Sequence, residues 1–302
     1  MKSRHLRLIL NGKSAGRDDV RAAVGHVREQ GHSVSVRVTW EAGDAGRFGR
    51  EAMELAEQEG IDTVIAGGGD GTVNEVISGA LSGLNGDQRP PVSFGVLPLG
   101  TANDFALGLG IDPGNLPDCL QRAAESPAKP IDVGQVNGRY FVNMATGGFG
   151  ARITTETDPQ LKKLLGGAAY LFTGLHRFSE LAACEGRISG PDFSWDGAFL
   201  ALAIGNGRRA GGGVELCPQA KVDDGLLDLT IIPYPTPDRV PEMLATLFEQ
   251  GPNALRESVF ETRSSRITLE TENTIQMNLD GEPARATRFD VAVQVARIDF
   301  IV

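Results

Sequence analysis

The chain has 302 residues, and at roughly 150 residues per domain its length predicts two domains. Hydrophobic residues make up 41% of it and charged residues 23%, which is typical of a globular protein and excludes a disordered or fibrous chain. The formal net charge of -10 argues against nucleic-acid binding and against strong attraction to an anionic membrane surface.

Strand-like and helix-like segments alternate along the first third of the chain. Residues 6–10 are typical of a buried strand, and residues 18–31 place apolar side chains at helical spacing. Residues 32–40 alternate as a second strand. The pattern continues with a turn at 41–46, a helix over 48–60, a strand over 61–66, a helix over 73–84, a strand over 92–99 and a short helix from 101. This order predicts a doubly wound α/β domain with a parallel sheet, whose ligands bind beyond the carboxyl ends of the strands.

The composition changes near residue 130, where Pro127 and Pro130 mark a predicted domain boundary. We expect an α/β domain over residues 1–130 and a β-rich, mostly antiparallel domain over residues 131–302. Strand-like runs in the second domain cover residues 140–145, 186–190, 198–206, 225–232, 265–270, 274–281 and 291–302, and helix-like runs cover 161–178 and 238–251. The apolar segment 161–178 fits either buried core or a lipid-facing surface. Three scattered cysteines without a CxxC pair argue against disulfides and a thiolate zinc site.

A run of glycines separates the third predicted strand from the helix that follows it. The segment Gly67-Gly68-Gly69-Asp70-Gly71-Thr72 lets the backbone approach a phosphate closely, and the amide groups and dipole of the helix N-terminus favour an anion. Thr72 and Glu75 have the spacing of a capping box. The segment is neither a Walker A loop nor G-x-G-x-x-G, because Lys is absent and Asn74 replaces the last glycine. A tight, capped strand-to-helix turn that binds no ligand is the alternative interpretation of this segment.

A second turn of similar design follows the fourth predicted strand. Gly100 and Thr101 come directly after the strand, and Thr101 and Asp104 again have the spacing of a helix cap, with Asn103 and Asp104 in the first turn. Because the carboxyl ends of parallel strands meet at one edge of the sheet, we expect the two turns to converge on one crevice. Two independently capped helices are the alternative interpretation.

These motifs resemble those of the diacylglycerol kinase catalytic-domain superfamily, which includes diacylglycerol, sphingosine and ceramide kinases. The resemblance rests first on GGGDGTVNE and LPLGTANDFA. It extends over nearly the whole chain to the bacterial YegS-type lipid kinases, through the segments ILNGKS, VRVTWEAGDA, FVNMATGGFGARITTET, IGNGRRAGGGVELCPQAKVDDGLLDL and NLDGEP.

The resemblance implies an α/β domain above a C-terminal antiparallel β-sandwich, with ATP in the cleft between them. With the glycine turn, it gives these candidate nucleotide-binding residues: Thr39, Gly67, Gly68, Gly69, Asp70, Gly71, Thr72, Val73, Asn74, Glu75 and Thr101. It also implies that Glu282 accepts the proton of the substrate hydroxyl. Asp224 and the backbone carbonyls of Lys221 and Leu226 would hold Mg²⁺, or Ca²⁺ in its place.

The residues of the second domain allow plainer interpretations as well. Asp223-Asp224-Gly225 carries the hard oxygen ligands that Mg²⁺ prefers, but Asp-Gly is also an ordinary hairpin turn. The stretch Asp280-Gly281-Glu282 could equally be a surface turn. Phosphoryl transfer to an alcohol requires positioning, charge stabilisation and a carboxylate that receives the proton. Glu282 suits that role and Asp280 is the substitute candidate, so the sequence leaves the choice between them open.

The sequence therefore predicts a kinase that uses ATP and Mg²⁺ to phosphorylate a lipid hydroxyl, with a phosphatidylglycerol-like or diacylglycerol-like acceptor. We expect a cytoplasmic protein without a transmembrane segment or nucleic-acid partner, meeting its lipid at the inner face of the membrane; the oligomeric state is not predicted. Two alternatives remain. One is a kinase of a soluble acceptor such as NAD, because NAD kinases and phosphofructokinases share related GGDG turns. The other is a nucleotide sensor without catalysis.

Overall fold

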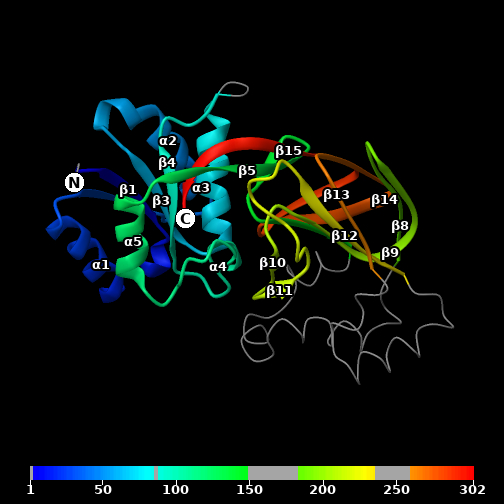
Figure 1. Ribbon diagram of the computed structural model, residues 1–302, viewed down its shortest axis with the longest axis horizontal. Helices are drawn as coiled ribbons and strands as arrows, with labels where there is room; N and C mark the ends of the chain where they lie inside the picture. The colour runs from blue at the N-terminus through cyan, green and yellow to red at the C-terminus, as the bar shows by residue number, and fades with distance from the viewer. Residues whose placement is uncertain (1–2, 85–87, 149–182, 235–258) are drawn as a thin grey trace, which may run out of the picture.

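The N-terminal lobe of the computed structural model is built on a parallel sheet. The structure describes residues 3–84, 88–148, 183–234 and 259–302. Strands β1 His5–Leu10, β2 Ser33–Val38, β3 Thr63–Gly68 and β4 Ser93–Pro98 lie in the order β2-β1-β3-β4. Helix α2 Asp44–Glu59 packs against α3 Asp70–Ser82, and α1 Asp18–Glu29 packs against α5 Leu116–Glu125 (Figure 1). The short helix α4 Asp104–Gly108 follows β4. This is the doubly wound α/β domain that the sequence predicts.

The central strands of this sheet are buried along nearly their whole length. Leu6, Leu8 and Ile9 of β1 and Ile65 of β3 are fully buried. Continuous apolar strands of this kind are required where helices cover both faces of a parallel sheet. The sheet edge is therefore held rigidly, and the segments that leave its carboxyl ends start from fixed positions.

The C-terminal lobe consists of antiparallel strands, as expected. Its strand order is β13-β12-β9-β7-β14-β15; β8 pairs with β9 and β14, β5 pairs with β15, and β6 pairs with β5. The bounds are β5 Ala128–Val136, β6 Arg139–Phe141, β7 Met144–Gly148, β8 Cys184–Gly190, β9 Phe193–Gly205, β10 Arg209–Ala210, β11 Val214–Glu215, β12 Leu227–Pro233, β13 Phe260–Ser264, β14 Arg266–Leu279 and β15 Glu282–Ile301. A second apolar core, including Phe199, Met277 and Phe289, fills this lobe.

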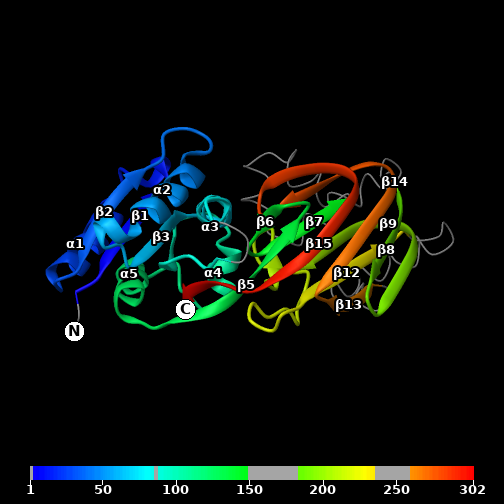
Figure 2. The same ribbon diagram turned by 90° about the horizontal axis from the view of Figure 1, so that it is seen from above.

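The long strand β15 connects the two lobes. Its first part pairs with β14 (Figure 2), whereas Asp299 and Phe300 near its end pair in parallel with β4. Phe300 packs edge-on against Phe105 of α4 at a ring-centroid distance of 5.3 Å. The final residues of the chain therefore belong to the N-terminal core, and β5 runs continuously through residue 130. The boundary between residues 130 and 131 stays a prediction.

Several elements differ from the sequence-based expectation. Helix α2 begins at Asp44 rather than at residue 48, because the Asp44 carboxylate accepts hydrogen bonds from the backbone of the preceding turn. Runs 265–270 and 274–281 form one irregular strand, β14. Helix α5 and strand β5 were not predicted from the sequence. The predicted helices 161–178 and 238–251 lie outside the described residues. No helix in the described part of the chain is long and apolar enough to cross a membrane.

Candidate active site

The first glycine turn joins β3 directly to the N-terminus of α3. Gly69 is the N-cap residue, and the helix starts at Asp70 without a side-chain cap. The predicted capping box of Thr72 and Glu75 is therefore wrong, because Thr72 already lies inside the first turn. The side chain of Thr72 packs closely against the end of β3, so a Cβ atom on Gly68 would lie 2.3 Å from Thr72 Oγ1. The turn thus presents uncapped helix amides, the donors that bind an anion.

The second turn lies directly against the first. A Cβ atom on Gly100 would lie 2.5 Å from the Cα atom of Gly69, so the two backbones approach as closely as glycine allows. Asn103, in the left-handed conformation at φ 51°, accepts a hydrogen bond from Gly100 N at 2.8 Å. The predicted convergence of the two turns is confirmed. Thr101 is exposed and does not cap α4, whose N-cap residue is Asn103.

Asp70 supplies the missing cap of α4 from the first turn of α3. Its carboxylate accepts hydrogen bonds from the backbone N–H groups of Asp104 at 3.1 Å and Phe105 at 2.9 Å. Burial raises the pKa of Asp70, and the hydrogen bond from Phe105 opposes that rise. Asp70 therefore holds the two turns together, and its two oxygens are already engaged by backbone donors.

Asp280 anchors the hairpin between β14 and β15. Asp280 and Gly281 form its two-residue turn, both with positive φ (50° and 106°), as an Asp-Gly hairpin turn requires. The partly buried Asp280 accepts hydrogen bonds through its carboxylate from the N–H groups of Val142 at 2.6 Å, Asn143 at 3.0 Å and Met144 at 2.7 Å. Burial raises the pKa of Asp280 to about 6, and these three hydrogen bonds limit the rise.

Glu282 follows this turn as the exposed first residue of β15, next to the first glycine turn. Asn74 Nδ2 donates to the carbonyl of Leu279 at 3.4 Å, and a Cβ atom on Gly71 would lie 3.5 Å from the carbonyl oxygen of Asp280. The pKa of Glu75 is raised by burial and by the negative charge of Glu282. The fold therefore brings Glu282, from the far end of the sequence, to the first turns of α3.

A third contact between the lobes joins α4 to the β10–β11 hairpin. The buried carboxylate of Asp104 accepts hydrogen bonds from Gly212 N at 2.8 Å and Gly213 N at 2.7 Å. Gly211, Gly212 and Gly213 all have positive φ, a conformation that suits glycine. The sequence pattern predicted Asp104 as part of a local helix cap with Thr101, and this long-range contact was not predicted. The run of three glycines was the available signal.

Comparison with known proteins agrees with this arrangement. Residues 5–136 match the family model "Diacylglycerol kinase catalytic domain", and residues 143–301 match "YegS C-terminal NAD kinase beta sandwich-like domain". The protein named "Probable lipid kinase YegS-like" from Pseudomonas aeruginosa is 50% identical over 293 residues, covering 96% of this chain and 92% of the relative. The chain belongs to the YegS-type lipid kinase family.

Other relatives of this YegS-type kinase extend the comparison. A protein of the same name from Alcanivorax borkumensis is 47% identical over 294 residues, covering 96% of this chain and 93% of the relative. The crystal structure of a diacylglycerol kinase from Bacillus anthracis superposes with a TM-score of 0.75 at 23% identity, covering 100% of this chain and 98% of that one. That structural likeness shows the shared two-lobe fold.

The loop predicted to bind a metal is occupied by an ion pair in this YegS-type kinase. The Asp224 carboxylate accepts a hydrogen bond from Leu226 N at 3.2 Å and pairs with the guanidinium of Arg263, which also contacts Asp228. Among the described residues, no group of three or more His, Cys, Asp or Glu side chains is placed to hold a metal. The predicted metal ligands do not fit a resident metal in this arrangement. Among Lys221, Asp224 and Leu226 only Asp224 has a carboxylate, and Arg263 already neutralises it.

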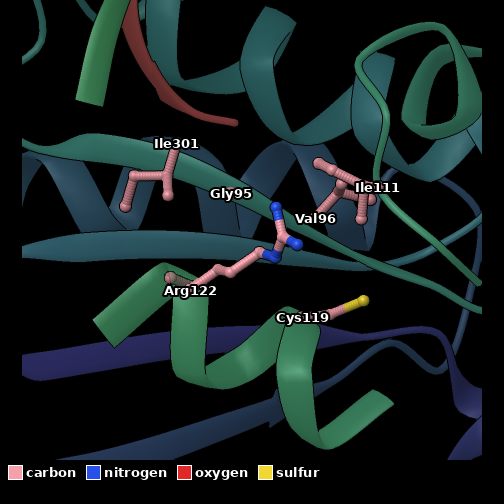
Figure 3. A pocket seen from close by; sticks show the side chains of 7 residues that line it. Gly95, Val96, Ile111, Cys119, Arg122 and Ile301 are labelled. Atoms are coloured by element: carbon pink, nitrogen blue, oxygen red, sulfur yellow. The ribbon is translucent and has the colours of Figure 1, made fainter. Parts of the chain in front are cut away.

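A small cavity beneath α5 is distinct from the turns that carry the motifs. It measures about 10 Å³ and lies between α5, β4 and the end of β15 (Figure 3). Its lining consists of Gly95, Val96, Ile111, Cys119, Arg122, Ala123 and Ile301. A space of that size holds at most about one water molecule, so it is a packing defect and cannot hold a substrate.

Proposed function

We propose that this YegS-type kinase transfers the γ-phosphoryl group of ATP to the hydroxyl of a phosphatidylglycerol-like or diacylglycerol-like lipid. The observation that carries this proposal is the placement of Glu282 beside Glu75, at the N-terminal end of α3. One side of the site thus offers amide donors to phosphate, and the other offers a carboxylate to a hydroxyl.

The phosphates of ATP would bind at the N-terminus of α3, where backbone N–H groups are available as donors. The first N–H groups of α3, at Asp70, Gly71 and Thr72, have no side-chain cap, and the helix dipole adds positive potential there. Mg²⁺ would arrive as part of the MgATP substrate. Phosphoryl transfer needs mainly positioning and charge stabilisation from the protein, and the two touching glycine turns supply rigid positioning.

Glu282 is the proposed proton acceptor for the lipid hydroxyl. The side chain is exposed at the start of β15, so a substrate can reach it. Asp280 is the weaker candidate because its carboxylate already accepts three backbone hydrogen bonds. We assign Asp280 to holding the turn that presents Glu282, and Glu282 to the reaction itself.

The test is turnover of MgATP with vesicles that contain phosphatidylglycerol, diacylglycerol, a sphingoid base or ceramide. We expect phosphate transfer to a glycerol-based lipid. Glu282→Gln should lower kcat by roughly 10²- to 10⁴-fold, the usual contribution of a positioned base, with little change in the KM for ATP. Glu185→Gln, a change at an exposed glutamate of β8, is the matched control. Undiminished turnover in the Glu282 variant would exclude the base.

The same assay separates the alternative functions. Rapid phosphorylation of NAD with none of any lipid would select a kinase of soluble acceptors, and ATP binding without transfer to any acceptor would select a sensor. For a lipid kinase with no membrane-spanning helix among its described residues, we propose a cytoplasmic location with transient contact at the inner face of the membrane. Co-sedimentation with vesicles during turnover tests that contact.

A further inference from the structure

A nearly fully exposed tryptophan lies just beyond the carboxyl end of β2. Trp40 is 95% exposed, far more than the other large hydrophobic side chains described as exposed. The other tryptophan of the chain, Trp195, is partly buried and packs against Phe199 at a ring-centroid distance of 6.1 Å. An indole ring provides a large apolar face, and leaving it in water forgoes the stabilisation that burial would provide.

The backbone that carries Trp40 is held firmly in place. Trp40 N and Glu41 N both donate to Asp44 Oδ2, at 2.7 and 3.1 Å, and Arg47 pairs with the other oxygen. These contacts lower the pKa of Asp44 to about 2, so the carboxylate stays charged at neutral pH. The exposed ring therefore extends from a fixed turn at the start of α2.

The strand register places this turn on the same sheet edge as the first glycine turn. Val38, Leu10 and Gly67 are partners in one row across β2, β1 and β3. Two inter-strand spacings, roughly 10 Å, separate β2 from β3. An extended nucleotide covers a comparable distance from its phosphates to its base.

Contacts between the three strand ends make this edge continuous. Thr39 Oγ1 accepts a hydrogen bond from Gly12 N at 3.1 Å, and Asn11 Nδ2 lies 3.5 Å from Thr72 Oγ1. A Cβ atom on Gly12 would lie 2.3 Å from the carbonyl oxygen of Thr39, so the backbones of the β1 and β2 ends touch. The edge thus runs without a break from Thr39, next to Trp40, to the first turn of α3.

We propose that Trp40 is the platform on which the adenine ring of ATP stacks, an inference that rests on the proposed nucleotide site at α3. Glu41, Asp44 and Arg47, the charged residues of this turn, together carry about one negative charge, which suits an uncharged base better than a phosphate or an anionic lipid surface. Stacking tolerates any base, so we expect GTP to bind with an affinity similar to that of ATP.

The experiment compares ligands with and without a base. In a Trp195→Phe background, Trp40 is the sole tryptophan, and its fluorescence should change on titration with ATP or ADP but not with tripolyphosphate. Trp40→Ala should raise the Kd for ATP roughly 5- to 150-fold and leave the Kd for tripolyphosphate unchanged. Trp40→Phe should recover much of the loss. If the Trp195 variant is unstable, the difference signal between wild type and Trp40→Phe gives the same readout.

The outcomes distinguish this inference from the proposed function. An unchanged ATP affinity in Trp40→Ala overturns the stacking role and leaves the kinase proposal standing. Reduced transfer to vesicle lipid at unchanged ATP affinity also overturns it, and assigns the ring to the membrane surface instead. If wild type binds neither ATP nor tripolyphosphate, the nucleotide site itself is wrong.

Discussion

At the scale of single residues, the acidic side chains of the motifs divide into two groups. Asp70, Asp104 and Asp280 each accept at least two backbone hydrogen bonds, as does Asp132, whose carboxylate binds Gly225 N and Ala296 N, each at 2.7 Å. Glu282, by contrast, is exposed at the site. The first group positions the backbone, and Glu282 is the carboxylate that we propose for proton transfer.

Asp280→Asn tests the first group through the pH dependence of stability. We expect the variant to be less stable than wild type at pH 4, because an amide nitrogen would face a backbone N–H donor. The pKa of Asp280 in the folded state, about 6, lies above the ordinary value of 3.8. The stability that its protonated form contributes is therefore lost as pH rises through about 6.

The stability difference between wild type and Asp280→Asn should consequently narrow by up to about 3 kcal/mol between pH 4 and pH 7, at 1.36 kcal/mol per pKa unit. Urea unfolding of both proteins across this range measures the difference. A difference that widens as pH rises would mean that the three backbone donors favour the charged carboxylate more strongly than burial opposes it.

At the scale of elements, the site depends on contact between the two glycine turns. Gly100→Ala places a Cβ atom 2.5 Å from Gly69 Cα and 2.9 Å from Asn103 Oδ1, so the turns must separate. We expect a loss of about 1–3 kcal/mol in unfolding free energy, together with a higher KM for ATP. Gly16→Ala, where a Cβ atom meets nothing within 4 Å, is the control and should leave both unchanged. Equal behaviour of the two variants would contradict the prediction.

The loop at Asp224 is a second element whose state can be tested. Arg263→Gln removes the guanidinium that pairs with Asp224 and Asp228, and leaves two carboxylates without their counter-charge. We expect Mg²⁺ or Ca²⁺ to raise the Tm of the variant more than that of wild type, because the cation can replace the missing counter-charge. Arg187→Gln, which breaks an exposed pair with Asp196, is the control. Identical metal-induced shifts in all three proteins would show that Arg263 does not occupy a cation position.

At the scale of the whole molecule, the two lobes are connected by strand pairing and by side-chain caps. Strand β15 pairs with both lobes, and Asp104 binds the hairpin of residues 209–215. Closely fixed lobes matter for a kinase because small displacements of reacting groups reduce the rate strongly.

Asp104→Asn should loosen this connection. One of the amides of Gly212 and Gly213 would then face an NH₂ group, at a cost of about 1–3 kcal/mol. Hydrogen exchange of a peptide covering residues 208–216 should become faster, and kcat should fall. Asp192→Asn, at an exposed turn between β8 and β9, is the control. Unchanged exchange in the Asp104 variant would refute the role of this contact.

The sequence by itself determined the alternation of strands and helices, the parallel sheet, the two glycine turns and their convergence. These are local properties, because side-chain periodicity and glycine backbone freedom act over a few residues. The predicted helix caps were wrong: α3 begins without a side-chain cap, and α4 is capped by Asp70 from 34 residues earlier in the chain and not by Thr101.

Only the tertiary structure decided which carboxylates bind backbone and which remain accessible. Asp104 meets Gly212 across 108 residues, and Asp280 meets Val142 across 138. The tertiary structure also pairs Arg263 with Asp224, which lies 39 residues away in the sequence. No local pattern encodes such partners, because a hydrogen bond depends on where two distant segments come to lie after the core has packed.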